Sequence, residues 1–259
     1  MSSSKKYIFS GYEYAGYRIK YDLHTHTTYS HGIGSIEDNV EAARKAGLTK
    51  IAITDHGPGH LTYGIDRKAV PAMRADVKAM RAKYPDIEIL LGVEANLMLS
   101  PNHLDIGPYE FSYFDFVIAG YHYGIPKGNC VPNWVNHHLP GGFLQKSLLV
   151  QNTEMTVAAL HENDIKILTH PGDKGPFDMK ELARACEETN TLMEVSTWHS
   201  HLTFDEIKLC KNFDVQFIVS SDAHMPARVG DAGGAIKRLL DAGVEPERVV
   251  NIEKVSKED

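Results

Sequence analysis

Residues of metal-ligand type recur along this chain, and the first group shows by its spacing what it could do. Asp22, His24 and His26 alternate with apolar or hydroxyl residues. If residues 19–23 form a strand, side chains two apart point to the same face, so all three leave it together. Two imidazoles on one face can hold a metal ion. An exposed strand end would look similar, but His31 follows after a short turn and comparable residues recur later.

Further motifs of the same kind stand after apolar runs of strand length. They contain Asp55 with His56, Glu94, His122, His170, and Asp222 with His224. Neutral imidazoles and carboxylates suit zinc, manganese or iron, and without cysteine ligands the composition does not choose among these metals. The motifs therefore predict one metal centre that is built from distant segments.

Strands and helices are expected to alternate along the chain. The expected strands are residues 19–23, 50–54, 87–93, 115–119, 165–169, 192–195 and 215–220, and the expected helices are residues 35–46, 67–83, 153–162, 178–188, 204–212 and 231–242. This order predicts an α/β fold with parallel strands around a closed or nearly closed barrel. Function collects at the carboxyl ends of such strands, where the ligand-type residues stand. We expect an N-terminal arm over residues 1–18 and a single-domain barrel over residues 19–259.

Composition excludes several classes of protein. The net charge of -7 argues against a general nucleic-acid or anionic-membrane surface, so no stable nucleic-acid partner is expected. Cys130, Cys186 and Cys210 form no Cys-x-x-Cys pattern and are expected to be reduced thiols. No secretion signal and no membrane-spanning apolar run is found, which predicts a soluble, cytoplasmic protein. Residues 123–142, rich in Pro, Gly and Asn, are expected to form a long loop that selects the substrate.

The motifs together resemble those of the polymerase and histidinol phosphatase (PHP) family of metal-dependent phosphoesterases, and more closely its short YcdX-type branch. The resemblance covers the chain from about Arg18 to Val255, and the motifs stand in family order. It implies a distorted seven-stranded, TIM-like barrel with up to three divalent ions, and a homo-oligomer as a possible assembly. One ion would take His24, His26, Glu94 and Asp222, a second would share Glu94 and add His122 and His170, and the third would take His31, His56 and His224.

The expected reaction is hydrolysis of a small phosphomonoester. Hydroxide held by the metal ions would attack phosphorus in line, with Glu94, Asp222 and His224 at the catalytic centre. With three divalent ions and two carboxylates, the site has a formal charge of roughly +4, which favours binding of a phosphate dianion. Arg228 and His60 are the expected substrate contacts, because a guanidinium can bind two phosphate oxygens and His60 follows the His56 motif closely.

Some alternatives stay open. Histidinol phosphate, nucleotides and sugar phosphates are all candidate substrates. An amidohydrolase-like enzyme would place similar ligands at barrel strand ends, although its usual carboxylated lysine has no obvious counterpart here. A metal-binding protein without turnover and a proofreading nuclease are further alternatives. Asp22 and Asp55 could orient ligand histidines or make ordinary turn and core hydrogen bonds. His199 and His201 form another His-x-His pair but have no place in the family pattern, so they are not expected to bind metal.

Overall fold

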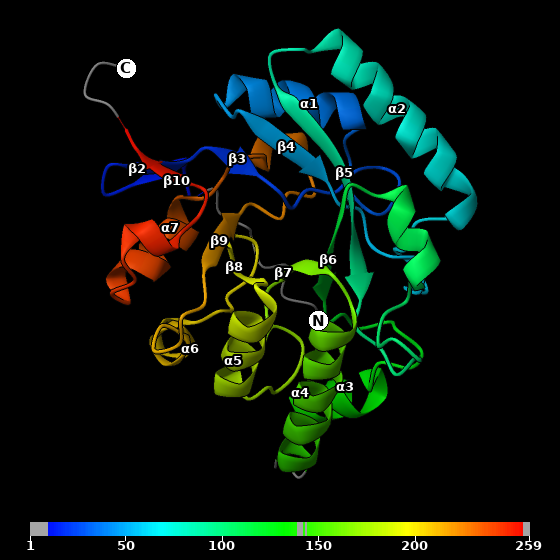
Figure 1. Cartoon of the computed structure of the whole chain (residues 1–259), viewed down its shortest axis with the longest axis vertical. Coiled ribbons are helices and arrows are strands. Elements are labelled where there is room, and N and C mark those ends of the chain that lie inside the picture. The colour runs from blue at the N-terminus through cyan, green and yellow to red at the C-terminus, as the bar shows by residue number, and fades with distance from the viewer. Residues whose placement is uncertain (1–9, 139–141, 143, 256–259) are drawn as a thin grey trace.

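A parallel sheet forms the centre of the computed structural model, which describes residues 10–138, 142 and 144–255 (Figure 1). Its strands neighbour one another in chain order from β3 to β9, and every pairing in this seven-stranded sheet is parallel. The strands are β3 (Tyr21–Asp22), β4 (Lys50–Ile53), β5 (Glu88–Asn96), β6 (Phe116–Gly120), β7 (Ile165–Leu168), β8 (Leu192–Ser196) and β9 (Phe217–Ser220). The expected α/β fold class is therefore confirmed.

The sheet closes nearly into a barrel where β9 approaches β3. Beyond the carboxyl ends of these strands, Thr25 and Ala223 form a parallel bridge. At the other end the side chain of Asn251 fills the gap. Its Nδ2 donates to the carbonyls of Tyr21 at 2.9 Å and Val219 at 2.7 Å, and its Oδ1 accepts from the Val219 N–H at 3.0 Å. One buried side chain thus replaces part of the missing backbone ladder.

Helices cover the outside of the sheet. They are α1 (Ile36–Lys45), α2 (Val70–Lys83), α3 (Cys130–His138), α4 (Gln145–Glu162), α5 (Met179–Thr189), α6 (Phe204–Cys210) and α7 (Gly233–Asp241), with 3-10 turns η1 (Arg67–Ala69), η2 (Pro108–Tyr113), η3 (Pro226–Arg228) and η4 (Pro246–Arg248). In Figure 1, α1 and α2 lie on one side of the sheet and α3, α4 and α5 on the opposite side. Across the described residues, none of the helices has the length and apolar character needed to cross a membrane.

Local capping residues fix where several helices begin. Ser35 accepts from the Asp38 N–H at 3.1 Å, and the Asp38 carboxylate accepts from the Ser35 N–H at 2.8 Å. Thr203 and Glu206 make the same reciprocal pair at the start of α6. Each pair satisfies backbone N–H groups that the first turn of a helix leaves free.

The structure differs from the sequence expectation between β6 and β7. The stretch expected as a loop over residues 123–142 contains α3, and α4 begins at Gln145 instead of near residue 153. Pro132 lies in the first turn of α3, where proline is tolerated because its missing N–H would be free in any case. In α4 the buried positions include polar Asn152, which obscures the apolar period. Residues 139–141 of the expected loop lie outside the described residues.

A small antiparallel sheet joins the two ends of the described chain. It consists of β1 (Glu13–Tyr14), β2 (Tyr17–Ile19) and β10 (Ile252–Lys254), in the order β1-β2-β10. The β10 strand was not expected from the sequence. Residues 1–9 of the expected arm lie outside the described residues.

Candidate metal centre

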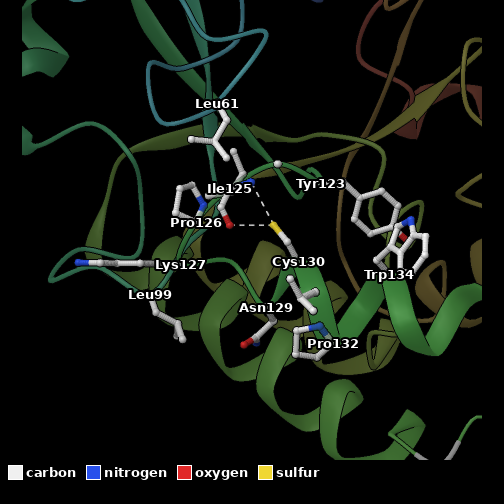
Figure 2. A pocket seen from close by; sticks show the side chains of 12 residues that line it. Leu61, Leu99, Tyr123, Ile125, Pro126, Lys127, Asn129, Cys130, Pro132 and Trp134 are labelled. Carbon is white, nitrogen blue, oxygen red and sulfur yellow. Dashed lines mark hydrogen bonds between the residues drawn. The ribbon is translucent and has the colours of Figure 1, made fainter.

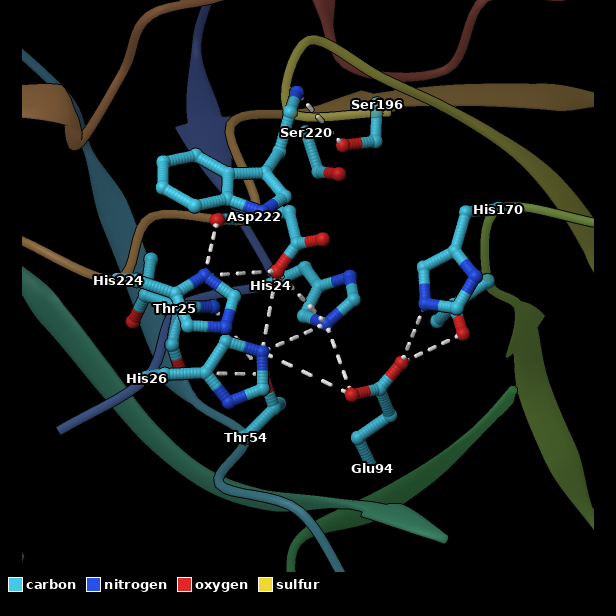
Figure 3. Close-up of polar contacts among 12 residues, drawn as sticks. His24, Thr25, His26, Thr54, Glu94, His170, Ser196, Ser220, Asp222 and His224 are labelled. Carbon is cyan, nitrogen blue, oxygen red and sulfur yellow. Dashed lines mark hydrogen bonds and ion pairs between the residues drawn. The ribbon is translucent and has the colours of Figure 1, made fainter. Parts of the chain in front are cut away.

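The strand ends place imidazoles around one buried carboxylate, Glu94, on β5 (Figure 3). Its Oε2 lies 3.3 Å from His24 Nε2 and 2.8 Å from His56 Nδ1. Its Oε1 lies 3.3 Å from His122 Nε2 and 3.0 Å from His170 Nε2. The two oxygens of one carboxylate thus face two separate groups of imidazoles. A carboxylate that bridges two cations has this arrangement.

A second carboxylate completes the group beside Glu94 Oε2. Asp222 follows β9, and its Oδ1 lies 3.1 Å from His26 Nε2 and 3.5 Å from His24 Nε2. The two Nε2 atoms are themselves 3.1 Å apart. Two nitrogens and two oxygens that converge in this way suit a four-coordinate divalent ion. The structure therefore brings together the four residues predicted for the first ion.

The hydrogen bonding of this group indicates that a cation belongs there. Glu94 Oε2 and Asp222 Oδ1 are both buried, and neither has a hydrogen-bond partner among the described residues. A buried acceptor without a partner costs about 1–3 kcal/mol, and more when it is charged. A divalent ion between the carboxylates and the imidazoles would satisfy both oxygens at once. The residues present therefore fit a metal ion.

The rings predicted for the third ion also lie together. The His31 ring centroid is 4.8 Å from that of His56 and 4.2 Å from that of His224. The ligand-type nitrogens of His26, His56 and His224 lie within 4.8 Å of one another. The structure thus gathers the predicted residues, although His26 takes the place of His31 in the tighter group.

Two ligand-type imidazoles are held by acceptors that the sequence analysis did not single out. His24 Nδ1 lies 2.7 Å from Glu194 Oε1, and His122 Nδ1 lies 2.8 Å from Asn96 Oδ1. Such bonds fix the tautomer that leaves Nε2 free to bind a metal. Asn96 is two residues after Glu94 on β5 and so points to the same face. Glu194 is a charged residue inside a fully buried part of β8, and this mismatch was its signal in the sequence.

The aspartates considered for this orienting role have other partners. Asp22 accepts from Ser221 Oγ at 2.5 Å and from the Gly230 N–H at 3.0 Å. Asp55 accepts from the Thr27 N–H at 2.7 Å. Both carboxylates hold the loops that contain the ligand residues, so the structure favours the alternative of core hydrogen bonds.

Replacing Glu194 should weaken metal binding while the barrel stays folded. Glu194→Gln keeps the shape of the side chain but removes the charge opposite His24, and changes of this type reduce metal affinity by about 10- to 100-fold. Competition with a chromophoric chelator measures that affinity. Glu206→Gln is a matched control, because Glu206 Oε2 lies 2.9 Å from His201 Nδ1 in another glutamate-histidine pair. Equal affinity in Glu194→Gln and the unchanged protein would contradict the prediction.

Burial and the neighbouring carboxylates together set the charge of the imidazoles. It lowers the pKa of both His31 and His122 to about 3, so these rings are neutral at pH 7 and their nitrogens can bind a cation. Burial also opposes the charged form of His24, but Asp222 and two glutamates raise its pKa well above the usual value. Burial alone would raise the pKa of Glu94, yet the surrounding imidazoles, His122 foremost, hold it well below its usual range.

A cavity of about 400 Å³ opens over the ligand-type residues. Its other lining residues are His60, Tyr63, Tyr123, Lys174, Trp198 and His199. Its volume lies within the range of about 300–1,000 Å³ that small-molecule sites occupy. The candidate metal centre is therefore open to a small substrate.

His199, which the sequence analysis left outside the site, lies inside it. Its Nε2 is 3.0 Å from Asp222 Oδ2 and its Nδ1 is 3.0 Å from Asp173 Oδ2. Burial opposes the charged ring, but these two carboxylates raise the pKa of His199 to about 9. Lys174 pairs with the same Asp173. Lys174 and His199 therefore stand together in the cavity wall, and only the long-range packing of the loops after β7 and β8 places them there.

The two expected substrate contacts are placed differently. His60 lines the cavity, and its Nδ1 accepts from the Tyr63 N–H at 3.0 Å, which leaves the proton of the neutral ring on Nε2. Arg228 is not among the lining residues. It is buried with its Nη2 2.5 Å from Asp231 Oδ2, and its guanidinium carbon lies 5.2 Å from the centre of the Trp198 ring. This placement differs from the expected phosphate contact.

The buried ion pair predicts that Arg228→Ala acts mainly on stability. Removal of the guanidinium leaves the Asp231 carboxylate buried without its partner, which costs about 3 kcal/mol. Urea unfolding measures the loss. Arg184→Ala removes an exposed pair with Glu181 and should change stability by less than about 1 kcal/mol. A raised KM at unchanged stability would instead support a phosphate contact.

Comparison with known proteins agrees with the geometry. Residues 22–202 match the family model of the PHP domain. A protein described as "probable phosphatase" from Thermoanaerobacter sp. (strain X514) is 29% identical over 249 residues, covering 90% of this chain and 91% of that protein. Another from Caldanaerobacter subterraneus subsp. tengcongensis is 30% identical over 250 residues, covering 90% of this chain and 87% of that protein.

Solved structures show the same fold. Histidinol phosphate phosphatase from Lactococcus lactis subsp. lactis, complexed with zinc, L-histidinol and phosphate, superimposes with a TM-score of 0.58 at 16% identity. The superposition covers 87% of this chain and 94% of that chain. At this identity the likeness shows the fold alone, whereas the family model spans most of the sequence. The chain therefore belongs to the PHP domain family and is a hydrolase of the phosphatase type.

Proposed function

We propose that the enzyme hydrolyses a small phosphomonoester at a centre of two to three divalent ions, which are zinc, manganese or iron. The observation that supports this most is the position of Glu94, whose two oxygens face separate imidazole groups. Zinc and phosphate are bound together in the Lactococcus lactis structure of the same fold, which is consistent with this chemistry. The YcdX-type branch, a cytoplasmic location and a homo-oligomer remain predictions.

The first two ions would share Glu94 as a ligand. The first would be held by His24, His26, Glu94 and Asp222, the second by Glu94, His122 and His170, and the third by His31, His56 and His224. When bound, the ions would polarise the phosphoryl oxygens and supply an activated water at neutral pH. Glu94, Asp222 and His224 would thus serve catalysis as metal ligands.

The remaining side chains of the cavity would bind and orient the ester. Lys174 would attract the phosphate dianion because its ammonium group is cationic, and His199 would contact the ester from the same cavity wall. His60 would contact the ester from the cavity wall. No nucleophilic side chain is required, since water would break the phosphorus-oxygen bond.

Metal analysis together with a substrate screen tests the proposal. The purified protein is reconstituted with zinc, manganese or iron, and its metal content is measured. The screen includes p-nitrophenyl phosphate, histidinol phosphate, nucleotides, sugar phosphates, and matched carboxylic esters and amides. We expect two to three ions per chain and metal-dependent phosphate release. Bound metal with hydrolysis of esters or amides only would assign an amidohydrolase-like reaction, and failure to bind metal would refute the proposal.

A further inference from the structure

A second cavity, of about 570 Å³, lies next to the cavity of the metal centre (Figure 2). Most of its wall is apolar and comes from Leu61, Leu99, Ile125, Pro126, Pro132 and Trp134. Leu99 is 52% exposed and Trp134 is 50% exposed, although large apolar side chains are normally covered. Its volume lies in the range of about 300–1,000 Å³ typical of sites for small organic molecules. The features together describe an apolar binding pocket, which we call the side pocket.

The side pocket shares a wall with the cavity of the metal centre. The side chain of Tyr123 lines both cavities. Leu61 follows His60 directly, and its N–H donates to the Gly124 carbonyl at 3.1 Å. Gly124 has φ +88°, and a Cβ there would lie 2.8 Å from His60 Cε1, so only glycine allows the two segments to pack so closely. The two cavities therefore adjoin at Tyr123, so a molecule bound at the metal centre lies close to the side pocket.

Tyr123 presents a hydrogen-bond donor without a partner at this wall. Its hydroxyl is buried and makes no hydrogen bond among the described residues. A tyrosine hydroxyl ordinarily has a pKa of about 10, so it keeps its proton at neutral pH. A buried donor without a partner costs about 1–3 kcal/mol, which an acceptor on a ligand would recover. Phosphate oxygens are such acceptors.

We propose that the side pocket binds the organic group of the substrate, so that the enzyme prefers phosphomonoesters of alcohols with a large apolar part, and that Tyr123 positions the phosphate. This inference rests on the proposed phosphatase function and names its substrate class. The pocket is concave and adjoins the reacting centre, which favours a part of the substrate over a docked protein. The phosphate would lie at the ions while the apolar group passes Tyr123 and covers Leu99 and Trp134.

Alkylphosphonates of increasing length test the side pocket without being hydrolysed. Their inhibition constants are measured on the metal-loaded enzyme, from methylphosphonate to octylphosphonate. We expect the constant to fall by roughly threefold for each methylene that enters the pocket, as apolar burial predicts. Trp134→Ala should remove most of this gain. Phe204→Ala, which removes an aromatic side chain 40% exposed on α6, should preserve it.

Tyr123→Phe separates the hydroxyl from the apolar wall. The variant keeps the ring and loses only the donor. We expect it to weaken methylphosphonate and octylphosphonate alike by about tenfold, because the lost hydrogen bond goes to the phosphonate group that both share. A weakening that grows with chain length would contradict the positioning role of the hydroxyl.

Fluorescence reports pocket occupancy without turnover. The chain contains two tryptophans, so the Trp198→Phe variant leaves Trp134 as its only indole. Octylphosphonate should shift the emission of Trp134, whereas methylphosphonate should not.

The possible outcomes separate the side pocket from the phosphatase function. Hydrolysis of p-nitrophenyl phosphate with equal inhibition constants along the series would overturn the side pocket and leave the function standing. Absence of hydrolysis with every phosphomonoester would instead remove the function. Concentration-dependent dimerisation that Trp134→Ala abolishes, without any effect of chain length, would assign this surface to contact between two copies and also overturn the inference.

Discussion

Glu94→Gln is expected to lower kcat/KM by about 10³-fold and to release at least two of the bound ions. An amide has one oxygen and one NH₂ group, so it cannot present an acceptor to both groups of imidazoles that Glu94 faces. It also removes the negative charge between them. Loss of metal catalysis removes several kcal/mol of transition-state stabilisation, which corresponds to about this factor.

The measurement combines metal content, kcat/KM for p-nitrophenyl phosphate and the thermal unfolding curve. Glu206→Gln serves again as the control, because Glu206 lies at the start of α6 and pairs with His201 outside the metal centre. The control should retain both its ions and its activity. A Glu94→Gln enzyme with a full complement of ions would show that Glu94 does not bridge them.

Asp222→Asn should lower kcat/KM by a similar factor, about 10³-fold, but release one ion only. Asp222 Oδ1 faces His24 and His26, and the ligand set predicted for the second ion does not include Asp222. The backbone conformation of Asp222 makes asparagine the appropriate substitution. Asp222 has φ +50°, a conformation that asparagine adopts more readily than alanine does, so asparagine disturbs the backbone less.

Ion counts in the two variants test whether Glu94 has a special position. One ion lost from Asp222→Asn and two or more from Glu94→Gln would agree with a bridging Glu94. Equal losses would contradict it. Asp222→Ala is a poor substitute for this comparison, because a strained backbone would move His224, whose Nδ1 lies 2.9 Å from the Asp222 carbonyl.

The fold and the ligand-type residues could be predicted because their signals are local. An apolar run such as that of β9 indicates a buried strand by itself, and Asp222 stands two residues after its end. The bridge between Thr25 and Ala223 then brings the first and last strand ends together, as a closed barrel requires. Because the strands are parallel and neighbour one another in chain order, residues that follow their carboxyl ends lie together at one site.

The features that could not be predicted depend on contacts between distant segments. His199 and His201 have the same spacing as His24 and His26. Of this second pair, however, only His199 reaches Asp222, whereas His201 pairs with Glu206. The position of His199 follows from the path of the loop after β8, which no local pattern specifies. Arg228 is the opposite case, since its partner Asp231 is three residues away and the spacing was visible in the sequence. Because arginine often binds phosphate, the sequence suggested that role for Arg228 instead of the ion pair with Asp231.

Closure of the barrel by Asn251 also sets the order of events during biosynthesis. The hydrogen bond from Asn251 to Tyr21 joins residues 230 positions apart, and the pair of Asp222 with His24 spans almost the same stretch. A nascent chain that has left the ribosome only as far as β8 has neither Asp222 nor Asn251. It holds His24, His26 and Glu94 but cannot complete the first group of ligands or close the barrel. The first group of ligands is therefore completed only after β9 and the segment that follows it have been synthesised.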